Sequence, residues 1–124
     1  MKLRIRGNSL RIRLSRTEVQ QLCSGATLED STSFGQNRFV YLVRPVETGD
    51  ALSAGYEEGV ITLYVPQALL QDWPTNTVVG FDARMAVSDS ESLYLLLEKD
   101  FKCLDADATQ EDQSDYYDNP DKTC

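Results

Sequence analysis

Apolar and charged residues alternate in two short runs near the start of the chain, LRIR at residues 3–6 and LRIRL at residues 10–14. A period of two predicts strands that bury one face. The apolar positions change from odd to even between the two runs, so one straight strand would place them on opposite faces. We therefore predict a hairpin that turns at Gly7-Asn8 and exposes a row of arginines. A strong bulge within one long strand is the alternative.

Two short helices are predicted between strands. The sequence SRTE at residues 15–18 matches a capping box, which predicts a helix at about 15–24 that stops near Gly25. Pro66 suits the first turn of a second helix, which Pro74 would end. The expected buried face of that second helix consists of Ala68, Leu69, Leu70 and Trp73.

Further strands are predicted where β-branched, aromatic and aliphatic residues lie between turn residues. The strong signals lie at residues 39–43, 60–65 and 92–98, and the weaker ones at 26–33, 52–57 and 78–81. We expect Pro45 to end the strand at 39–43. The last strong strand has apolar residues on both faces, which predicts a central position. The fold class expected is α+β, a mainly antiparallel sheet of about six to eight strands with two short helices.

The two halves of the chain show similar patterns at one constant offset, which indicates a ββαββ pseudo-repeat. Chance similarity of two amphipathic units explains the match as well as a duplication does. The aligned apolar pairs are Leu14 with Val65, Val19 with Leu70, and Leu22 with Trp73.

Length and charge indicate one small domain, at residues 1–104, and an acidic C-terminal tail, at 105–124, that we expect to pack on it. The net charge of −8 argues against nucleic-acid binding, which needs a basic surface. Six of the twelve basic residues lie within the first sixteen positions, and nine of the twenty acidic residues lie in 98–124. No run is apolar enough for a signal peptide or a membrane span, so a cytoplasmic location with reduced thiols is expected.

The absence of histidine from the sequence removes Ser-His-Asp and Cys-His nucleophile systems. Cys103 and Cys124 lie among many carboxylates, which suggests that they bind a metal or form a redox pair. Their spacing matches no standard set of metal ligands, so we predict no cofactor. Cys103 lies near Lys99 and Lys102, which would lower its pKa, yet an inert thiol is the preferred interpretation. Trp73 and Phe81 are expected in the core.

The basic start of the chain and its acidic end are predicted to form one interaction surface. The N-terminal arginines would be a solvated strand face, a partner for the acidic tail, or an anion site. Tyr116 and Tyr117 are expected to anchor the tail through their rings. The candidate surface comprises Arg4, Arg6, Asn8, Arg11, Arg13, Glu98, Lys99, Asp100, Phe101, Cys103, Asp112, Asp115, Tyr116 and Tyr117.

Three segments carry a family resemblance: MKLRIRGNSLRIRLSRTEV at the start, LLLEKDFKCLD at residues 95–105, and EDQSDYYDNPDKTC at the end. The chain resembles an uncharacterised family of short bacterial proteins whose members open with an LRIRGNSLRLRL-type segment. They close with EKDFxCLD and an EDxxDxxPNP tail. Asp118 stands where the family pattern has the first proline. The resemblance implies a bacterial cytosolic origin, no particular activity, and a surface shared by the two ends.

The function expected from these features is a small cytosolic binding or regulatory module without enzymatic activity. Its expected partner is a protein or an anionic small molecule, and the chain could form a homodimer. Binding to nucleic acid or to a membrane is not expected. The alternative is an enzyme or carrier for an anionic small molecule. In that alternative the arginines hold the anion, and Glu98 or Asp100 with a bound divalent ion does the chemistry, all inside one concave sheet.

Overall fold

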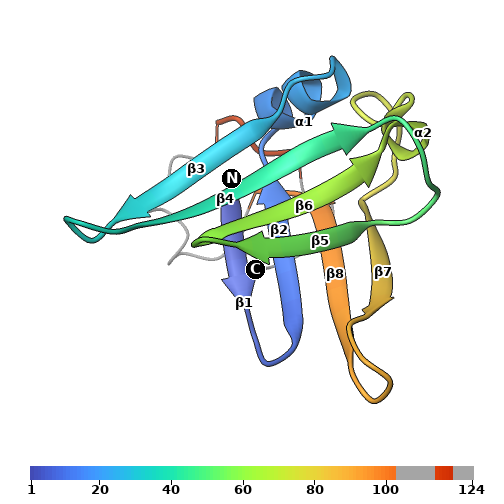
Figure 1. Cartoon of the computed structure of the whole chain (residues 1–124). Helices are drawn as coiled ribbons and strands as arrows, with labels where there is room; N and C mark the ends of the chain where they lie inside the picture. The colour runs from blue at the N-terminus through green and yellow to red at the C-terminus, as the bar shows by residue number, and fades with distance from the viewer. Residues whose placement is uncertain (103–113, 119–124) are drawn as a thin grey trace.

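The computed structural model of the protein describes residues 1–102 and 114–118. These residues form eight strands and two helices arranged as two four-stranded sheets (Figure 1). Sheet A has the order β1 (Lys2–Ile5), β2 (Ser9–Leu14), β8 (Ser92–Lys99) and β7 (Gly80–Ala86). Sheet B has the order β3 (Leu28–Ser33), β4 (Arg38–Val46), β6 (Val60–Pro66) and β5 (Ser53–Glu57). The helices are α1 (Arg16–Cys23) and α2 (Gln67–Leu70).

The order of elements confirms the ββαββ pattern, because β1-β2-α1-β3-β4 is followed by β5-β6-α2-β7-β8. Each half places its first hairpin in one sheet and its second hairpin in the other. The helix between the two hairpins carries the chain across from sheet to sheet. Both sheets are therefore built jointly by the two halves, and neither half could form a complete sheet alone.

The α+β class, the eight strands and the two helices agree with the sequence prediction, but the sheets are mixed rather than purely antiparallel. Within each hairpin the strands are antiparallel, whereas the central pairs β2–β8 and β4–β6 are parallel. These central strands come from different halves and have no direct connection. A parallel pair needs a long crossover, which the intervening elements supply.

The predicted hairpin at the start of the chain is confirmed. β1 pairs antiparallel with β2, and Gly7 in the turn has a φ of 53° that favours glycine. The predicted capping box is also present: Ser15 caps α1 by accepting a hydrogen bond from the amide of Glu18. The Glu18 carboxylate accepts one from the amide of Ser15 in return.

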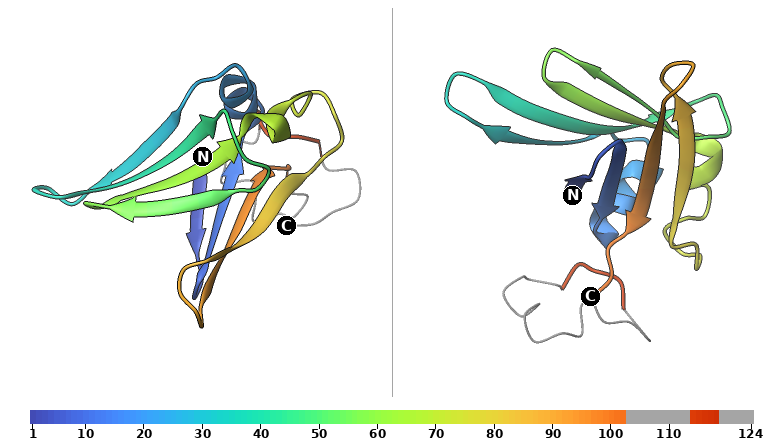
Figure 2. Two further views of the ribbon diagram at one scale, coloured as in Figure 1. Left: turned by 45° about the vertical axis from the view of Figure 1, so that its right-hand side comes forward. Right: turned by 90° about the horizontal axis from the view of Figure 1, so that it is seen from below.

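The core lies between the two sheets, whose strands cross instead of running side by side (Figure 2). The helices lie at one end of the molecule, at the top of Figure 1. Val19 and Leu22 of α1 and Leu70 of α2 are buried there. All six residues of the aligned repeat pairs belong to this core. The end away from the helices has no such cover in the described residues, which leaves the sheets splayed.

Three predicted boundaries were wrong for local reasons. Pro45 lies inside β4 instead of ending it, since parallel pairing with Val65 continues through it. α2 is a single turn, and Ala68 is exposed although it was expected to be buried. The strand expected at residues 78–81 begins only at Gly80, because the preceding segment supplies carbonyl groups to Trp73 and to β8. β8 occupies the central position predicted for it.

Candidate functional site

The outer face of sheet A, turned away from the core, carries six of the fourteen predicted interaction residues: Arg4, Arg6, Arg11, Arg13, Glu98 and Asp100. Alternation along β2 buries its aliphatic residues and turns Ser9, Arg11 and Arg13 outward. Cross-strand pairing then places Arg4 beside Arg11 and Glu98 beside Arg13. We call this set the basic face. Among the described residues its charged members are Lys2, Arg4, Arg6, Arg11, Arg13, Arg84, Asp82, Glu98 and Asp100.

Glu98 binds two arginines at once. Its Oε1 lies 2.6 Å from Nε and Nη2 of Arg11 and 2.8 Å from Nε of Arg13. The Glu98 side chain is 13% exposed, against 32% and 39% for the two arginines. Charge-assisted bonds to a half-buried carboxylate fix the direction of both guanidinium groups. Arg11 and Arg13 are therefore held in place and leave only part of their charge for a ligand.

Arg4 and Arg6 differ from Arg11 and Arg13 in being exposed. Within residues 1–102 and 114–118 neither makes an ion pair. With Arg11 and Tyr94 they line a shallow hollow of about 200 Å³. Three guanidinium groups around one hollow offer a matched set of donors to carboxylate or phosphate oxygens.

Tyr94 and Arg84 extend the basic face across β8 and β7, and the sequence analysis missed both. The guanidinium carbon of Arg84 lies 5.2 Å from the centre of the Tyr94 ring. The Tyr94 hydroxyl donates a 3.0 Å hydrogen bond to Asp82. This bond, then burial and the negative charge of Asp82, raise the pKa of Tyr94. The cross-strand register that joins these residues has no signal in the local sequence.

Lys99 was predicted on the interaction surface, but it is 4% exposed. Its odd position on β8 places it on the inner face with Leu95 and Leu97. Its ammonium donates to the carbonyl of Asn76 at 2.8 Å and lies over the Trp73 and Tyr117 rings. Burial lowers the pKa of Lys99, and the negative charge of Cys23 in its thiolate form acts in the opposite direction. Lys99 is thus part of the packing beneath the C-terminal segment.

Asn8 and Asp100 also have structural contacts. The Asn8 side-chain amide donates to the carbonyl of Ser92 at 2.7 Å, which joins the tips of two hairpins in sheet A. Asp100 is 5% exposed, and its carboxylate lies 3.0 Å from the ammonium of Lys2. Asn8 therefore fixes the hairpin end of the basic face, and Asp100 fixes its opposite end through Lys2.

Residues 114–118 contact the domain near the start of α1 and the end of β8. The Tyr117 ring lies 6.0 Å from that of Phe101 and contacts Lys99 and Arg16. The Tyr117 amide and carbonyl bond to the backbone of Asp100 and Lys102. Burial raises the pKa of Tyr117, and among the described residues its buried hydroxyl has no hydrogen-bond partner. The Tyr116 ring lies 4.5 Å from the Lys2 ammonium. For both rings the predicted anchoring role matches these contacts.

Asp115 holds the first turn of α1. Its carbonyl accepts from the amide of Arg16 at 2.8 Å, and its carboxylate accepts from the amide and hydroxyl of Thr17. Burial alone would raise the pKa of Asp115. Hydrogen bonds from Thr17 and Ser15 and the charge of Arg16 outweigh it, so the pKa falls below the ordinary 3.8. A carboxylate at a helix N-terminus is stabilising because it meets unpaired amides and the positive end of the dipole.

We expect Asp115→Ala to lower the free energy of unfolding by about 1 kcal/mol at neutral pH, the usual cost of losing a capping carboxylate. Because the folded pKa lies below the unfolded one, this stabilisation is present above about pH 4 and disappears as pH falls further. Urea unfolding at several pH values measures both effects. Asp118→Ala is the control: Asp118 is 85% exposed and pairs with Lys102, so a change within about 0.5 kcal/mol is expected. Equal losses in the two variants would contradict this role of Asp115.

Two predicted site residues, Cys103 and Asp112, lie outside the described residues, as does Cys124. The division of the chain into a domain and a tail at residue 104 stays a prediction for the same reason. Burial raises the pKa of the remaining thiol, Cys23, while the charge of Lys99 lowers it. In the described part of the chain, no group of three or more histidine, cysteine or acidic side chains is arranged to hold a metal ion.

The enzyme or carrier alternative requires the arginines inside one concave sheet, whereas Arg4 and Arg6 are exposed on the outer face of sheet A around a shallow hollow. None of the helices in residues 1–102 and 114–118 has the length and apolar character needed to cross a membrane. The basic face is therefore an open surface with an ordered centre, at Glu98, and an exposed basic edge, at Arg4 and Arg6.

Residues 1–121 match a family of unknown function, DUF7009. No curated protein and no solved structure shows detectable similarity to the chain. The match covers nearly the whole sequence, and the chain belongs to this family of unknown function.

Proposed function

We propose that the protein is a small, non-enzymatic binding module whose basic face recognises an acidic segment of a protein partner. The observation that supports this most is the local charge. The basic face carries six basic and three acidic side chains, on a chain with a net charge of −8. A bacterial cytoplasmic setting belongs to the same proposal and rests on the family resemblance.

The division of labour within the basic face supports recognition by charge. Arg11 and Arg13 are oriented by Glu98, so they lose little freedom when a partner binds. Arg4 and Arg6 supply exposed guanidinium groups next to them. Arginine is frequent among the residues that dominate binding energy, since its planar group pairs with carboxylates in two-point contacts.

A labelled oligoglutamate peptide tests the proposal by fluorescence anisotropy at low ionic strength. We expect the double variant Arg4→Glu/Arg6→Glu to weaken binding by about tenfold or more, since tenfold corresponds to only about 1.4 kcal/mol. Binding by the unchanged protein should weaken as salt is added, because exposed charges are screened.

The matched control is Arg38→Glu/Arg44→Glu, which changes the net charge equally at exposed positions of β4 in sheet B. It should alter the affinity by no more than about twofold, since it lies on the other sheet and distant charges are screened. Equal weakening in the two double variants would show only a response to net charge and would overturn the proposal.

A further inference from the structure

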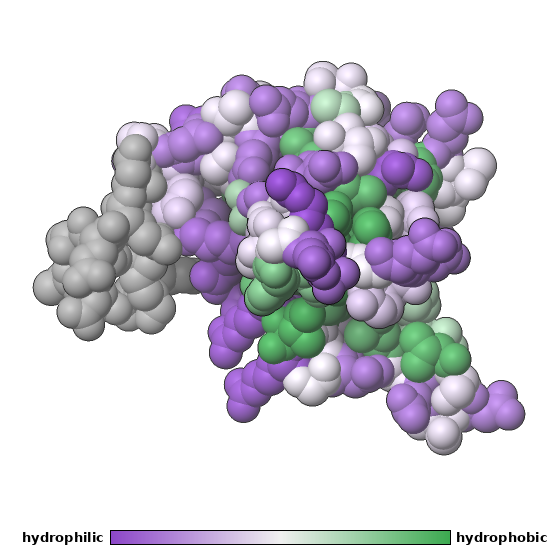
Figure 3. Space-filling model, turned by 60° about the vertical axis from the view of Figure 1, so that its left-hand side comes forward, coloured by the Kyte–Doolittle hydropathy of each residue, from purple (hydrophilic) through white to green (hydrophobic). Residues whose placement is uncertain are grey.

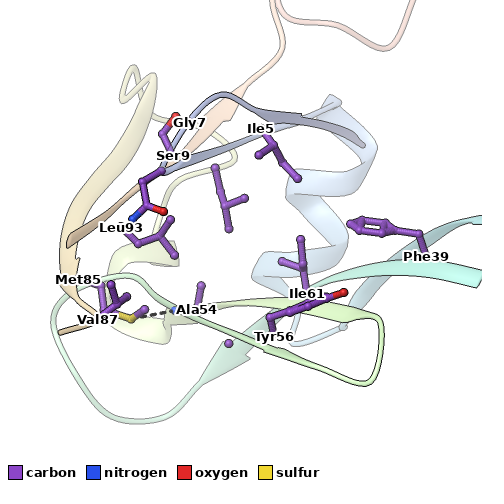
Figure 4. Close-up of a pocket in the computed structure, with 13 residues that line it drawn as sticks. Ile5, Gly7, Ser9, Phe39, Ala54, Tyr56, Ile61, Met85, Val87 and Leu93 are labelled. Carbon is purple, nitrogen blue, oxygen red and sulfur yellow. Dashed lines mark hydrogen bonds between the residues drawn. The ribbon is translucent and has the colours of Figure 1, made fainter. Parts of the chain in front are cut away.

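An apolar cleft of about 450 Å³ opens at the end of the molecule that the helices do not cover. Its walls come from both sheets, and no residue that lines it carries a charge. Figure 4 shows side chains such as Ile5, Phe39, Ile61, Met85 and Leu93 arranged around the opening. This volume and apolar lining are typical of sites that hold a ligand or an anchoring side chain.

The rim of the cleft exposes large apolar side chains. Ile5 is 54% exposed, Tyr56 67% and Val87 48%; they come from β1, from β5 and from the position just after β7. Figure 3 shows hydrophobic surface near the lower edge of the molecule, between hydrophilic side chains. Apolar surface gathered around a cleft and bordered by polar residues is characteristic of an interaction site.

Two contacts join the strands that line the cleft. The amide of Ala54 in β5 lies 3.4 Å from the sulfur of Met85 in β7, where the edges of the two sheets meet (Figure 4). Asn8 joins the β1–β2 and β7–β8 hairpins through the Ser92 carbonyl. The first contact bridges the two sheets, and the second links the two hairpins of sheet A. Residues 114–118 contact the opposite end of β8, about 20 Å or more away at strand spacing, so they do not occupy it.

The charge beside the cleft indicates what would occupy it. The cleft and the hollow lined by Arg4, Arg6 and Arg11 share Ser9 and Leu10, so they lie on either side of the β1–β2 hairpin. A ligand that bends over this hairpin meets apolar walls on one side and guanidinium groups on the other. Both features fit a segment that carries an apolar side chain next to carboxylates.

We propose that the cleft receives an apolar anchor residue of the same acidic partner segment that binds the basic face. This inference rests on the proposed function and adds to it the partner's chemistry: a large aliphatic or aromatic side chain flanked by acidic residues. Interfaces of this kind concentrate their affinity in a few buried anchors, while the charges around them fix orientation and speed association.

The test compares two labelled peptides of equal charge, oligoglutamate and oligoglutamate with a central tryptophan. We expect the tryptophan peptide to bind about tenfold tighter, as expected for one buried anchor. Ile5→Ser/Val87→Ser should abolish this advantage and leave oligoglutamate binding unchanged. Both positions are substantially exposed, so folding should survive, and a thermal melt checks this.

The matched control is Val78→Ser/Val79→Ser, which removes two valines that are 40% and 41% exposed and do not line the cleft. It should retain the full advantage of the tryptophan peptide. Equal affinity of the two peptides for the unchanged protein would overturn the inference while leaving the proposed function standing. Failure of both peptides to bind would overturn the proposed function itself.

Two other occupants give distinguishable results. A dimer that forms with rising protein concentration and is lost in Ile5→Ser/Val87→Ser would assign the cleft to a second copy of the chain. A long-chain carboxylate that binds tighter than the tryptophan peptide and displaces it would assign it to a lipid. Either result would overturn the peptide-anchor inference.

Discussion

Trp73→Ala is expected to lower the free energy of unfolding by about 3–5 kcal/mol, the usual cost of truncating a buried aromatic residue. Trp73 is fully buried, and its ring lies 5.0 Å from that of Phe81. Its indole N–H donates to the carbonyl of Val78 at 2.8 Å. The side chain therefore joins the segment after α2 to the core and supports the ring contact with Lys99.

Urea unfolding followed by circular dichroism measures this loss, since the variant lacks the chain's one tryptophan. Phe34→Ala is the control: Phe34 is an aromatic residue that is 74% exposed, and its removal should change stability by no more than about 0.5 kcal/mol. A loss below about 1 kcal/mol for Trp73→Ala would contradict the packing described for this side chain.

Gly80→Ala should be the second most damaging of the proposed changes, with a loss of about 1–3 kcal/mol from overpacking. Gly80 faces Glu98 across the β7–β8 pair. A Cβ atom there would collide with the Leu97 carbonyl oxygen and would lie 2.7 Å from the Glu98 Cβ. Both contacts are too short, and the first involves backbone that cannot turn away.

The substitution also tests the link between fold and binding. Moving Glu98 would disturb its contacts with Arg11 and Arg13 and with them the centre of the basic face. We therefore expect weaker oligoglutamate binding together with the lower stability. Trp73 fluorescence during urea unfolding provides the stability measurement, because this residue is buried.

Gly55→Ala is the matched control in sheet B. A Cβ atom at Gly55 would meet only the Tyr64 ring, at an ordinary contact distance of 3.9 Å. The lower entropy of the unfolded chain should then make the variant equally stable or more stable by about 0.4–1 kcal/mol. Identical behaviour of the two alanine variants would show that the strand beside Glu98 can relax.

Much of the local structure could be predicted from residue patterns alone. Alternation identified β1 and β2, since a strand with one solvent-exposed face needs apolar residues at every second position, and apolar residues on both faces identified β8 as a central strand. The capping box located α1 because both of its hydrogen bonds join residues three apart. The same alternation predicted that Arg4, Arg11 and Arg13 share one face. The short helix α2 was less well predicted, as one turn carries too little periodicity.

Tertiary structure decided which strands became neighbours. β2 pairs with β8 although the two are at opposite ends of the chain, and no local pattern specifies such a partner. That pairing places Glu98 between Arg11 and Arg13 and turns Lys99 into the interior. The apolar cleft has the same origin, because hairpins from both halves supply its walls.

The sequence by itself thus determined the elements, their exposed and buried sides, and the opposite charges of the two ends. The exchange of hairpins between the halves, the oriented centre of the basic face and the open cleft arose only in three dimensions. The physical reason is range: caps, turns and alternation depend on residues a few positions apart. Sheet order and cavities depend on contacts between distant segments. The entropy cost of bringing such segments together and the energy gained by packing them do not depend on any local pattern.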